Sequence, residues 1–351
     1  MDFSNLLIKW YLKNKRDLPW RNTTDSYSIW LSEIILQQTR VAQGLPYYLR
    51  FIETFPTVFD LARASENDVL VLWQGLGYYS RARNMHKTAQ YVANELNGVF
   101  PKTYSELKKL KGVGDYTAAA IASFCHDEEV PVVDGNVYRV LSRYFGVKED
   151  ISNTATKKVF VEIAKELIPK GKSHLFNQAI MEFGALQCLP KKADCMNCVF
   201  NNSCFAYANN CIESLPIKTK KAKVKNRFFN YLVVFDEFEN VLVNKRTEKD
   251  IWKNLYEFPL IEIELADDYE KLVQSIQEKF SFGYKISNLK PFHHHQIVHK
   301  LSHQNLHIKF WKASISGNFE NGLSIKNLSK LPFPVVIFNF IEKELLKIKK
   351  K

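Results

Sequence analysis

The stretch from Leu110 to Arg139 constrains this chain more than any other. It holds a glycine turn at residues 111–114, a run of small residues at 117–122, and an apolar run that ends in Asp134. Gly112 and Gly114 can adopt backbone angles closed to other residues, so the chain can reverse there between two helices and leave peptide N–H groups uncovered. Such groups at the start of a helix can bind a phosphate oxygen. An ordinary turn between two helices would show the same glycines, so the turn alone leaves both interpretations open.

Length and charge narrow the class of protein. The 351 residues are enough for two domains, and 46% hydrophobic with 25% charged residues is typical of a globular protein. The net charge of +12 favours an acidic partner, most often nucleic acid, although charge alone does not exclude an anionic membrane surface. No apolar run reaches the roughly 18 residues of a spanning helix. Residues 1–5 lack the features of a secretion signal, so we expect a cytoplasmic protein without a membrane segment.

One acid lies inside an apolar stretch. Residues 28–40 are apolar nearly all round, which predicts a buried helix with Glu33 near its centre. Burying a carboxylate is costly unless it is paired or protonated, and burial raises its pKa. Glu33 is therefore a candidate general acid. A pair between Glu33 and a buried arginine would explain the residue without any catalytic role.

Four of the six cysteines are clustered. Cys188, Cys195, Cys198 and Cys204 are spaced C-x6-C-x2-C-x5-C. Four thiolates on one loop can hold zinc or an iron–sulfur cluster. Two C-x2-C pairs would favour a zinc ribbon, and this pattern has only one. Cys125 and Cys211 fall outside the pattern, and we expect each to be a free thiol.

The sequence changes character after a lysine-rich stretch at residues 212–227, which we expect to be an extended linker. Runs at 228–235 and 241–246 predict strands around a turn at 236–240. A helix is expected at 267–280, a strand at 299–313 and a closing helix at 335–347. This pattern predicts an α+β domain of about 120 residues. The histidines at 293–295, 299, 303 and 307 allow a metal site, but a strand beside a histidine-rich loop explains them without one.

These features together resemble MutY-type adenine DNA glycosylases of the helix–hairpin–helix superfamily. The similarity lies in Leu-Ser-Glu-Ile-Ile-Leu-Gln-Gln-Thr at 31–39, in the glycine hairpin followed by Asp134, and in the cysteine spacing. Residues 251–259 resemble the Trp-Glu-Phe-Pro segment of Nudix-like folds, and residues 298–303 resemble the Phe-Ser-His loop with which MutY-type enzymes sense 8-oxoguanine. The resemblance covers residues 1–210 with several specific motifs and 228–348 more loosely.

The resemblance implies a fold and a domain plan. Residues 1–211 are expected to form a mostly α catalytic domain of the helix–hairpin–helix glycosylase fold, with a 4Fe–4S cluster loop at 188–204. The basic linker 212–227 would follow, and residues 228–348 would form a C-terminal α+β, Nudix-like domain that recognises 8-oxoguanine. The glutamate-rich Nudix catalytic helix is missing, so we expect this domain to bind and not to hydrolyse nucleotides.

The resemblance also assigns roles to residues. The catalytic group is expected to comprise Glu33, Asp134, Tyr116 and Asn136. Walls of the adenine pocket are expected at Trp20, Arg21, Leu36, Arg16 and Gln178, although Trp20 would serve equally as a core plug. Contacts with DNA are expected from Gln37, Gln38, Tyr78, Gly112, Gly114, Leu301, Ser302 and His303, with Tyr78 wedged into the duplex. The cluster ligands are expected to be Cys188, Cys195, Cys198 and Cys204.

The implied function is base excision. The chain would be a monofunctional glycosylase that flips adenine out of duplex DNA and excises it where it is mispaired with 8-oxoguanine or guanine. We expect a monomer that works in the bacterial cytoplasm and associates with the nucleoid through DNA.

Three positions depart from the patterns of related enzymes. Lys111 stands where the hairpin usually has proline, and Leu301 replaces the usual Phe of the sensing loop. Tyr116 stands where glycosylases that also cut the strand carry a nucleophilic lysine, and a tyrosine cannot form an imine.

Three rival interpretations remain. A bifunctional, endonuclease III-like glycosylase and lyase for oxidised pyrimidines would share the fold. A non-catalytic binder of damaged DNA would need neither Glu33 nor Asp134. A Nudix hydrolase would need the acidic helix that is missing.

Overall fold

The computed structural model describes residues 2–219, 224–264, 269–279, 286–293 and 295–346. Contacts divide the chain into two compact units. The first comprises residues 1–63 and 84–220, and the second comprises residues 64–83 and 221–351. The chain therefore passes between the units at 63/64, at 83/84 and at 220/221. Segment 64–83 belongs by its contacts to the C-terminal unit, which differs from the plan of one N-terminal domain up to residue 211.

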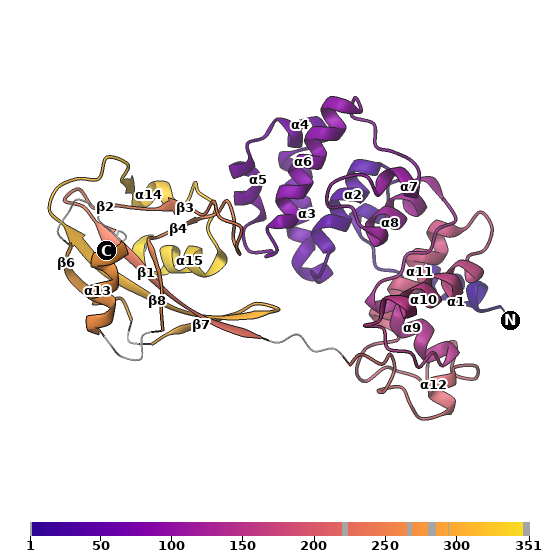
Figure 1. Cartoon of the computed structure of the whole chain (residues 1–351). Coiled ribbons are helices and arrows are strands. Elements are labelled where there is room, and N and C mark those ends of the chain that lie inside the picture. Colours follow the sequence, from indigo (N-terminus) through magenta and orange to yellow (C-terminus); the bar gives the residue numbers. More distant parts are fainter. Residues whose placement is uncertain (1, 220–223, 265–268, 280–285, 294, 347–351) are drawn as a thin grey trace. The chain divides into compact units, whose positions relative to one another are not determined.

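The first unit is helical (Figure 1). Its elements are α1 (Phe3–Asn14), the 3-10 turn η1 (Pro19–Arg21), α2 (Ser26–Leu36), α3 (Val41–Thr54), α4 (Val58–Arg63), α6 (Ser80–Glu95, whose first residues 80–83 fall in the second unit), α7 (Tyr104–Leu107), α8 (Asp115–His126), α9 (Gly135–Phe145), α10 (Thr154–Leu167), α11 (Ser173–Leu186) and α12 (Phe205–Ala208).

Local chemistry explains where the helices that carry the candidate site residues begin and end. The Asp25 carboxylate caps α2 by accepting the Ser28 N–H at 2.8 Å. α1 ends at Asn14, and Pro19 opens a separate 3-10 turn. The helix around Glu33 is shorter than expected. It ends at Leu36, since Gln37 has a non-helical backbone with ψ of 115°.

A core of aliphatic and aromatic side chains joins α1, α9, α10 and α11. Phe160, Phe176, Ile180 and Val137 are fully buried within it. These helices place the start of α9, and with it Asp134, against α11. The linker expected at 212–227 is also shorter than predicted. Leu215 is buried in the first unit, and the Ile217 carbonyl accepts a hydrogen bond from the Ile151 N–H.

The second unit is built on a sheet. The strand order among the described residues is β6 (Ile286–Pro291), β8 (Gln304–Ile315), β1 (Lys225–Phe235), β2 (Asn240–Val241) and β9 (Leu323–Ser324). β5 (Leu260–Glu262) pairs with β1, and β7 (Ile297–Lys300) pairs with β8. β1 and β8 run parallel over the whole of β1, whereas the other pairs are antiparallel. β3 (Asn244–Lys245) and β4 (Tyr256–Glu257) form a separate two-stranded sheet.

Both faces of the sheet are covered, which makes three layers. Alternate residues of β1 point to opposite faces, so Phe229, Tyr231 and Val233 pack on one side while Leu232 and Val234 pack on the other. The first face is covered by α14 (Ile325–Leu328), α15 (Val335–Phe340) and the π-helical turn η2 (Ile341–Leu346). The second is covered by α13 (Tyr269–Lys279). α5 (Glu66–Trp73) belongs to this unit through segment 64–83.

Two sequence expectations for this unit need correction. The single strand expected at 299–313 is a hairpin, because β7 ends at Lys300, and the Leu301 N–H donates to the Gln304 carbonyl at 2.7 Å to close the turn. The closing helix expected at 335–347 changes to π-helical hydrogen bonding after Phe340. Residues 267, 268, 280, 294 and 347, which were expected in helices or in the histidine run, lie outside the described residues. Within the described ranges, no helix is long and apolar enough to cross a membrane.

Candidate active site and cluster loop

Glu33 lies in the middle of α2 and is 6% exposed. Burial raises the pKa of its carboxyl to about 7, and a hydrogen bond from Tyr116 only partly opposes that shift. The negative charge of Asp134 raises the pKa further. Asp134, 101 positions away in the sequence, is thus close enough to raise the pKa of Glu33. Near neutral pH, Glu33 can exist in both protonation states, as a general acid requires.

Asp134 caps the start of α9. One carboxylate oxygen accepts the N–H groups of Asn136 and Val137, each at 2.8 Å, and the other accepts Asn136 Nδ2 at 2.8 Å. Burial raises the pKa of Asp134, although these hydrogen bonds oppose the shift. A helix cap alone would use the same contacts. The capped carboxylate is held in one orientation, which suits a group that stabilises a nearby positive charge.

Tyr116 lies in the first turn of α8, where the glycine hairpin leads into the helix. Gly112 has φ of +79°, and a Cβ there would lie 2.7 Å from the Cβ of Asn84, so the turn requires glycine. Nothing lies within 4 Å of the position of a Cβ on Gly114, which caps α8. A side chain at Gly114 would therefore meet open space at the start of α8. Burial, together with the charges of Glu33 and Asp134, keeps the pKa of Tyr116 well above its usual value, so its hydroxyl stays protonated.

Asn136 connects the Asp134 cap to Arg139. Arg139 Nη2 donates to Asn136 Oδ1 at 2.8 Å and to the Gly184 carbonyl at 2.6 Å. The same guanidinium donates through Nε to the Cys188 carbonyl at 2.7 Å. A continuous set of hydrogen bonds therefore runs from the cysteine loop through Arg139 and Asn136 to Asp134.

The expected walls of the base pocket fall into two groups. Arg16 and Arg21 both bind the carboxylate of Glu182, with Arg21 contacts of 2.7 and 2.8 Å. Gln178 accepts the hydroxyl of Tyr11 at 2.6 Å. Trp20 is 8% exposed and packs edge-on against Tyr48, while Leu36 is half-buried at the end of α2.

Glu182 is a site residue that the sequence analysis missed. It is 1% exposed, and its two arginine partners hold its pKa at about 2 despite burial. The charged carboxylate faces Arg21, whose positive charge also lowers the pKa of Glu33. The signal available in the sequence was an acid in the apolar run 176–184, the same signal that identified Glu33.

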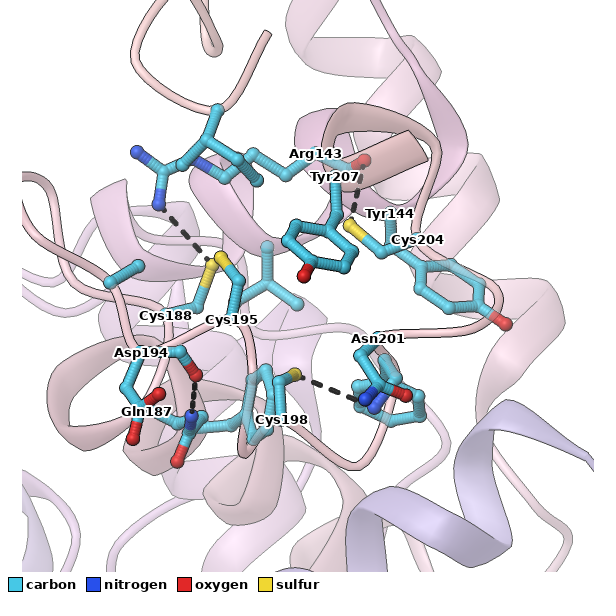
Figure 2. A pocket seen from close by; sticks show the side chains of 15 residues that line it. Arg143, Tyr144, Gln187, Cys188, Asp194, Cys195, Cys198, Asn201, Cys204 and Tyr207 are labelled. Carbon is cyan, nitrogen blue, oxygen red and sulfur yellow. Dashed lines mark hydrogen bonds between the residues drawn. The ribbon is translucent and has the colours of Figure 1, made fainter. Parts of the chain in front are cut away.

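Four cysteines line one pocket beside α9, as Figure 2 shows. Arg143 is 2% exposed, and its Nη1 lies 3.4 Å from Cys188 Sγ and 2.7 Å from the Leu189 carbonyl. The thiol of Cys204 donates to the Arg143 carbonyl at 3.4 Å. In the described ranges, no three His, Cys, Asp or Glu side chains are arranged as a metal site. The donor set, four thiols on one loop around a shared pocket, fits an iron–sulfur cluster in its chemistry.

Two family models match this chain. The model of the HhH-GPD superfamily base excision DNA repair protein matches residues 31–169, and that of the NUDIX domain matches residues 230–343. The adenine DNA glycosylase of Buchnera aphidicola subsp. Schizaphis graminum is 33% identical over 351 residues, which cover 97% of this chain and 98% of that protein. This chain belongs to the adenine DNA glycosylase family. Another relative, the human adenine DNA glycosylase, is 42% identical over 213 residues, which cover 58% of this chain and 39% of that protein.

Solved structures agree with this family. A thermostable thymine-DNA glycosylase is 29% identical with a TM-score of 0.54, over 59% of this chain and 95% of that one. Endonuclease III in a non-covalent complex with DNA has a TM-score of 0.51 at 22% identity, over 59% of this chain and 94% of that one, and it shows the fold alone. The expected fold class, a helix–hairpin–helix glycosylase domain followed by a Nudix-like domain, is confirmed.

The residues expected to contact DNA are distributed over both units of this adenine DNA glycosylase family member. In the first unit, Gln37 donates to Thr117 Oγ1 at 3.0 Å, so it is held beside α8, and Gln38 is exposed with φ of +55°. In the second unit, Tyr78 lies in the loop after α5. Leu301, Ser302 and His303 form the turn between β7 and β8, where Ser302 Oγ is 3.1 Å from His303 Nδ1.

Proposed function

We propose that this chain is a monofunctional glycosylase that releases adenine opposite 8-oxoguanine or guanine in duplex DNA. The feature that supports the proposal is the placement of two acids from separate motifs near Tyr116: burial and the negative charges of Glu33 and Asp134 all raise the pKa of its hydroxyl. Buried carboxyl groups with different hydrogen-bonding surroundings can divide the acid and the stabilising role between them. The family membership supports adenine as the base.

The first step is extrusion of the adenine, because the glycosidic bond is inaccessible inside a duplex. Gln37 and Tyr78 would fill the opened helix. The base would enter a pocket bounded by Arg21, Leu36 and Trp20, with Arg16 and Gln178 at its wall. Trp20 is the weakest of these assignments, since its ring is packed against Tyr48.

Bond cleavage then uses the two acids. Protonated Glu33 donates its proton to a ring nitrogen of adenine, and the electron pair of the glycosidic bond leaves with the base. The sugar carbon becomes positively charged, and the fixed carboxylate of Asp134 stabilises that charge. Water adds to the sugar carbon and loses a proton to the Glu33 carboxylate, which restores the acid and leaves an abasic site. Asn136 keeps Asp134 oriented through its hydrogen bonds, and Tyr116 lies close enough to Glu33 to lower the pKa of that acid.

The cysteine loop would hold a 4Fe–4S cluster through Cys188, Cys195, Cys198 and Cys204. When bound, the cluster would supply four metal–thiolate bonds that fix a loop with few apolar side chains. Arg139, in the middle of α9, and Arg143, in its last turn, hydrogen-bond to residues 188 and 189 and so join the cysteine loop to this helix. An ultraviolet–visible spectrum with iron and zinc analysis tests this assignment, and a colourless protein containing zinc would contradict it.

The Nudix-like unit would read the opposite base. The hairpin between β7 and β8 presents Ser302, whose exposed hydroxyl can donate to or accept from a purine edge. We expect the protein to act as a monomer on nucleoid DNA.

A base-release assay tests the whole proposal. Duplexes would carry adenine opposite 8-oxoguanine, guanine or thymine, and strand cutting would be followed with and without added alkali. We expect release from the first two duplexes and no cutting without alkali, because Tyr116 has no amine to form an imine. Cutting without alkali, or an adduct trapped by borohydride, would instead indicate a bifunctional enzyme.

A further inference from the structure

Side-chain hydrogen bonds join segment 64–83 to the rest of the second unit. Asn254 Nδ2 donates to Glu66 Oε1, and Arg83 Nη1 donates to the Lys253 carbonyl at 2.7 Å. These two contacts hold the two ends of the segment. Its middle is held at Phe333, whose N–H donates to Gln74 Oε1 at 2.9 Å and whose carbonyl accepts the Tyr79 hydroxyl at 3.3 Å.

The turn that holds the ends of the segment has an unusual backbone. Trp252 and Asn254 have φ of +61° and +67°, a region that side chains other than glycine rarely adopt and that is strained for a tryptophan. The turn is closed by a hydrogen bond from the Asn254 N–H to the Arg246 carbonyl at 2.7 Å. Arg246 is itself fixed by Glu257 at 2.6 and 2.8 Å. The surrounding structure therefore imposes the strained backbone that presents the Lys253 carbonyl and the Asn254 side chain to the segment.

The same segment presents Tyr78. Its ring is 45% exposed, its φ is +46°, and it follows Gly77 with φ of +74°. The carbonyl of Gly77 accepts Trp73 Nε1 at 3.0 Å, and the guanidinium of Arg81 lies 5.7 Å from the centre of the Tyr78 ring. On the other side, the Tyr78 carbonyl accepts the Arg81 N–H at 2.9 Å, so the backbone is held on both sides of Tyr78 while the residue stays 45% exposed.

The turn also contacts the base-reading hairpin. The ring of Trp252 lies 6.0 Å from that of His299, centre to centre, and His299 is on β7, two positions before Leu301. One short turn therefore contacts both the strand that leads to Ser302 and the segment that presents Tyr78.

We propose that the turn at residues 252–254, together with Phe333, positions Tyr78. The Nudix-like unit would then have two roles: it would set the orientation of the tyrosine that enters the DNA, and it would read the opposite base. The inference rests on the proposed function for the identity of the substrate. Gln74 and Arg83 act here as positioning residues, since they reach DNA only through the orientation they give to Tyr78.

The test compares Gln74→Ala and Arg83→Ala with a matched control, Lys253→Ala, in the full chain. The control removes one positive charge at the same place but keeps the carbonyl that Arg83 binds. Hydrogen exchange without DNA is the first measurement. We expect the amides of residues 75–80 to exchange faster in both variants than in the wild type, and to be unchanged in the control.

The second measurement places 2-aminopurine beside the target adenine and follows its fluorescence as Tyr78 enters the stack. We expect a smaller fluorescence rise and about five-fold weaker binding in Gln74→Ala and Arg83→Ala, while the single-turnover rate at saturating enzyme stays within about two-fold. In a Tyr78→Ala background, Gln74→Ala should have no further effect, because its action passes through the missing ring.

The outcomes separate this inference from the proposed function. If the wild type releases no adenine, the proposed function fails, while the exchange experiment still decides whether the turn holds the segment. If the wild type is active, additive effects of Gln74→Ala and Tyr78→Ala would overturn the inference, as would variants that match the wild type in exchange and fluorescence. Should Gln74→Ala fold poorly, Arg83→Ala against Lys253→Ala carries the same test.

Discussion

Burial of Glu33 lowers the stability of the folded chain when the carboxyl is ionised, and the same burial raises its pKa into the range that a general acid needs. Its pKa is about 7 in the folded chain and 4.5 in the reference state, so the folded chain retains the proton more strongly. The contribution of Glu33 to stability therefore falls as pH rises from about 4.5 through 7. That behaviour is the reverse of a salt-bridged surface glutamate, and it identifies a carboxyl whose charge the fold does not compensate.

The substitution Glu33→Gln tests both effects, on the free energy of unfolding and on the rate of adenine release. We expect the free energy of unfolding to rise by up to about 3 kcal/mol at pH 8 and to change little at pH 4, because only the ionised carboxylate is penalised. The single-turnover rate of adenine release should fall by about 10² to 10⁴-fold. Urea unfolding at both pH values and a base-release assay provide the measurements. A pH-independent change in stability would contradict the assignment of a raised pKa to Glu33.

Glu182 is the opposite case, because its charge is compensated. Replacing it with alanine would leave the half-buried guanidinium of Arg21 without its carboxylate partner. We expect Glu182→Ala to lower the free energy of unfolding by roughly 2 to 4 kcal/mol at pH 7. The effect should shrink as pH falls from about 4.5 to about 2, because protonation of the carboxylate in the wild type then removes the same ion pairs. A double-mutant cycle with Arg21→Ala checks the pairing, and additivity of the two changes would exclude it.

At the scale of elements, helix α9 joins the cysteine loop to the candidate site. The start of α9 is Asp134, and Arg139 and Arg143, one and two turns further along, bind carbonyls of residues 184, 188 and 189. A planar guanidinium with five donors can satisfy several carbonyls together, and an ammonium cannot copy that geometry.

We therefore expect Arg139→Lys to be nearly as damaging as Arg139→Gln. Each should slow adenine release through disorder of Asn136 and Asp134, and each should lower the free energy of unfolding by roughly 2 kcal/mol or more, since buried carbonyls lose their donors. Urea unfolding and single-turnover rates measure the two effects. Full activity of Arg139→Lys would contradict this prediction, because it would show that a positive charge at residue 139 is sufficient without the several donors of the guanidinium.

Local rules predicted many of these elements, and they failed where distant contacts decide. The glycine hairpin and the strand at 228–235 follow from glycine geometry and β-rich composition, which are local properties. Glu182 was missed because its two arginine partners lie more than 160 positions away. The assignment of segment 64–83 to the C-terminal unit depends on Asn254 and Phe333, which no pattern within the segment could indicate.

At the scale of the whole molecule, each unit has a core of its own, yet the chain crosses between them three times. A domain attached only by a linker would cross once. We expected a free linker of sixteen residues at 212–227. Its first half is instead held in the first unit, because Leu215 is buried and the Ile217 carbonyl accepts a hydrogen bond from Ile151. Less of this stretch is therefore free than we expected. By its contacts, the second unit therefore includes residues 64–83, a segment that lies within the match of the HhH-GPD model.

The net charge of +12 acts on all DNA equally, whereas the proposed reading of the mispair depends on short-range contacts. We expect the affinity for duplex DNA to fall by about 10³ to 10⁵-fold between 50 and 200 mM salt if roughly six to ten phosphates are contacted. The ratio of affinities for an adenine:8-oxoguanine duplex and an adenine:thymine duplex should change little over the same range, because hydrogen bonds from Ser302 release no counterions.

Fluorescence anisotropy on both duplexes measures this ratio and the slope of log affinity against log salt concentration. Ser302→Ala is the control, which should lower the ratio without changing the slope. A ratio that collapses with salt would mean that discrimination is electrostatic, and the role proposed for the β7–β8 hairpin would be wrong.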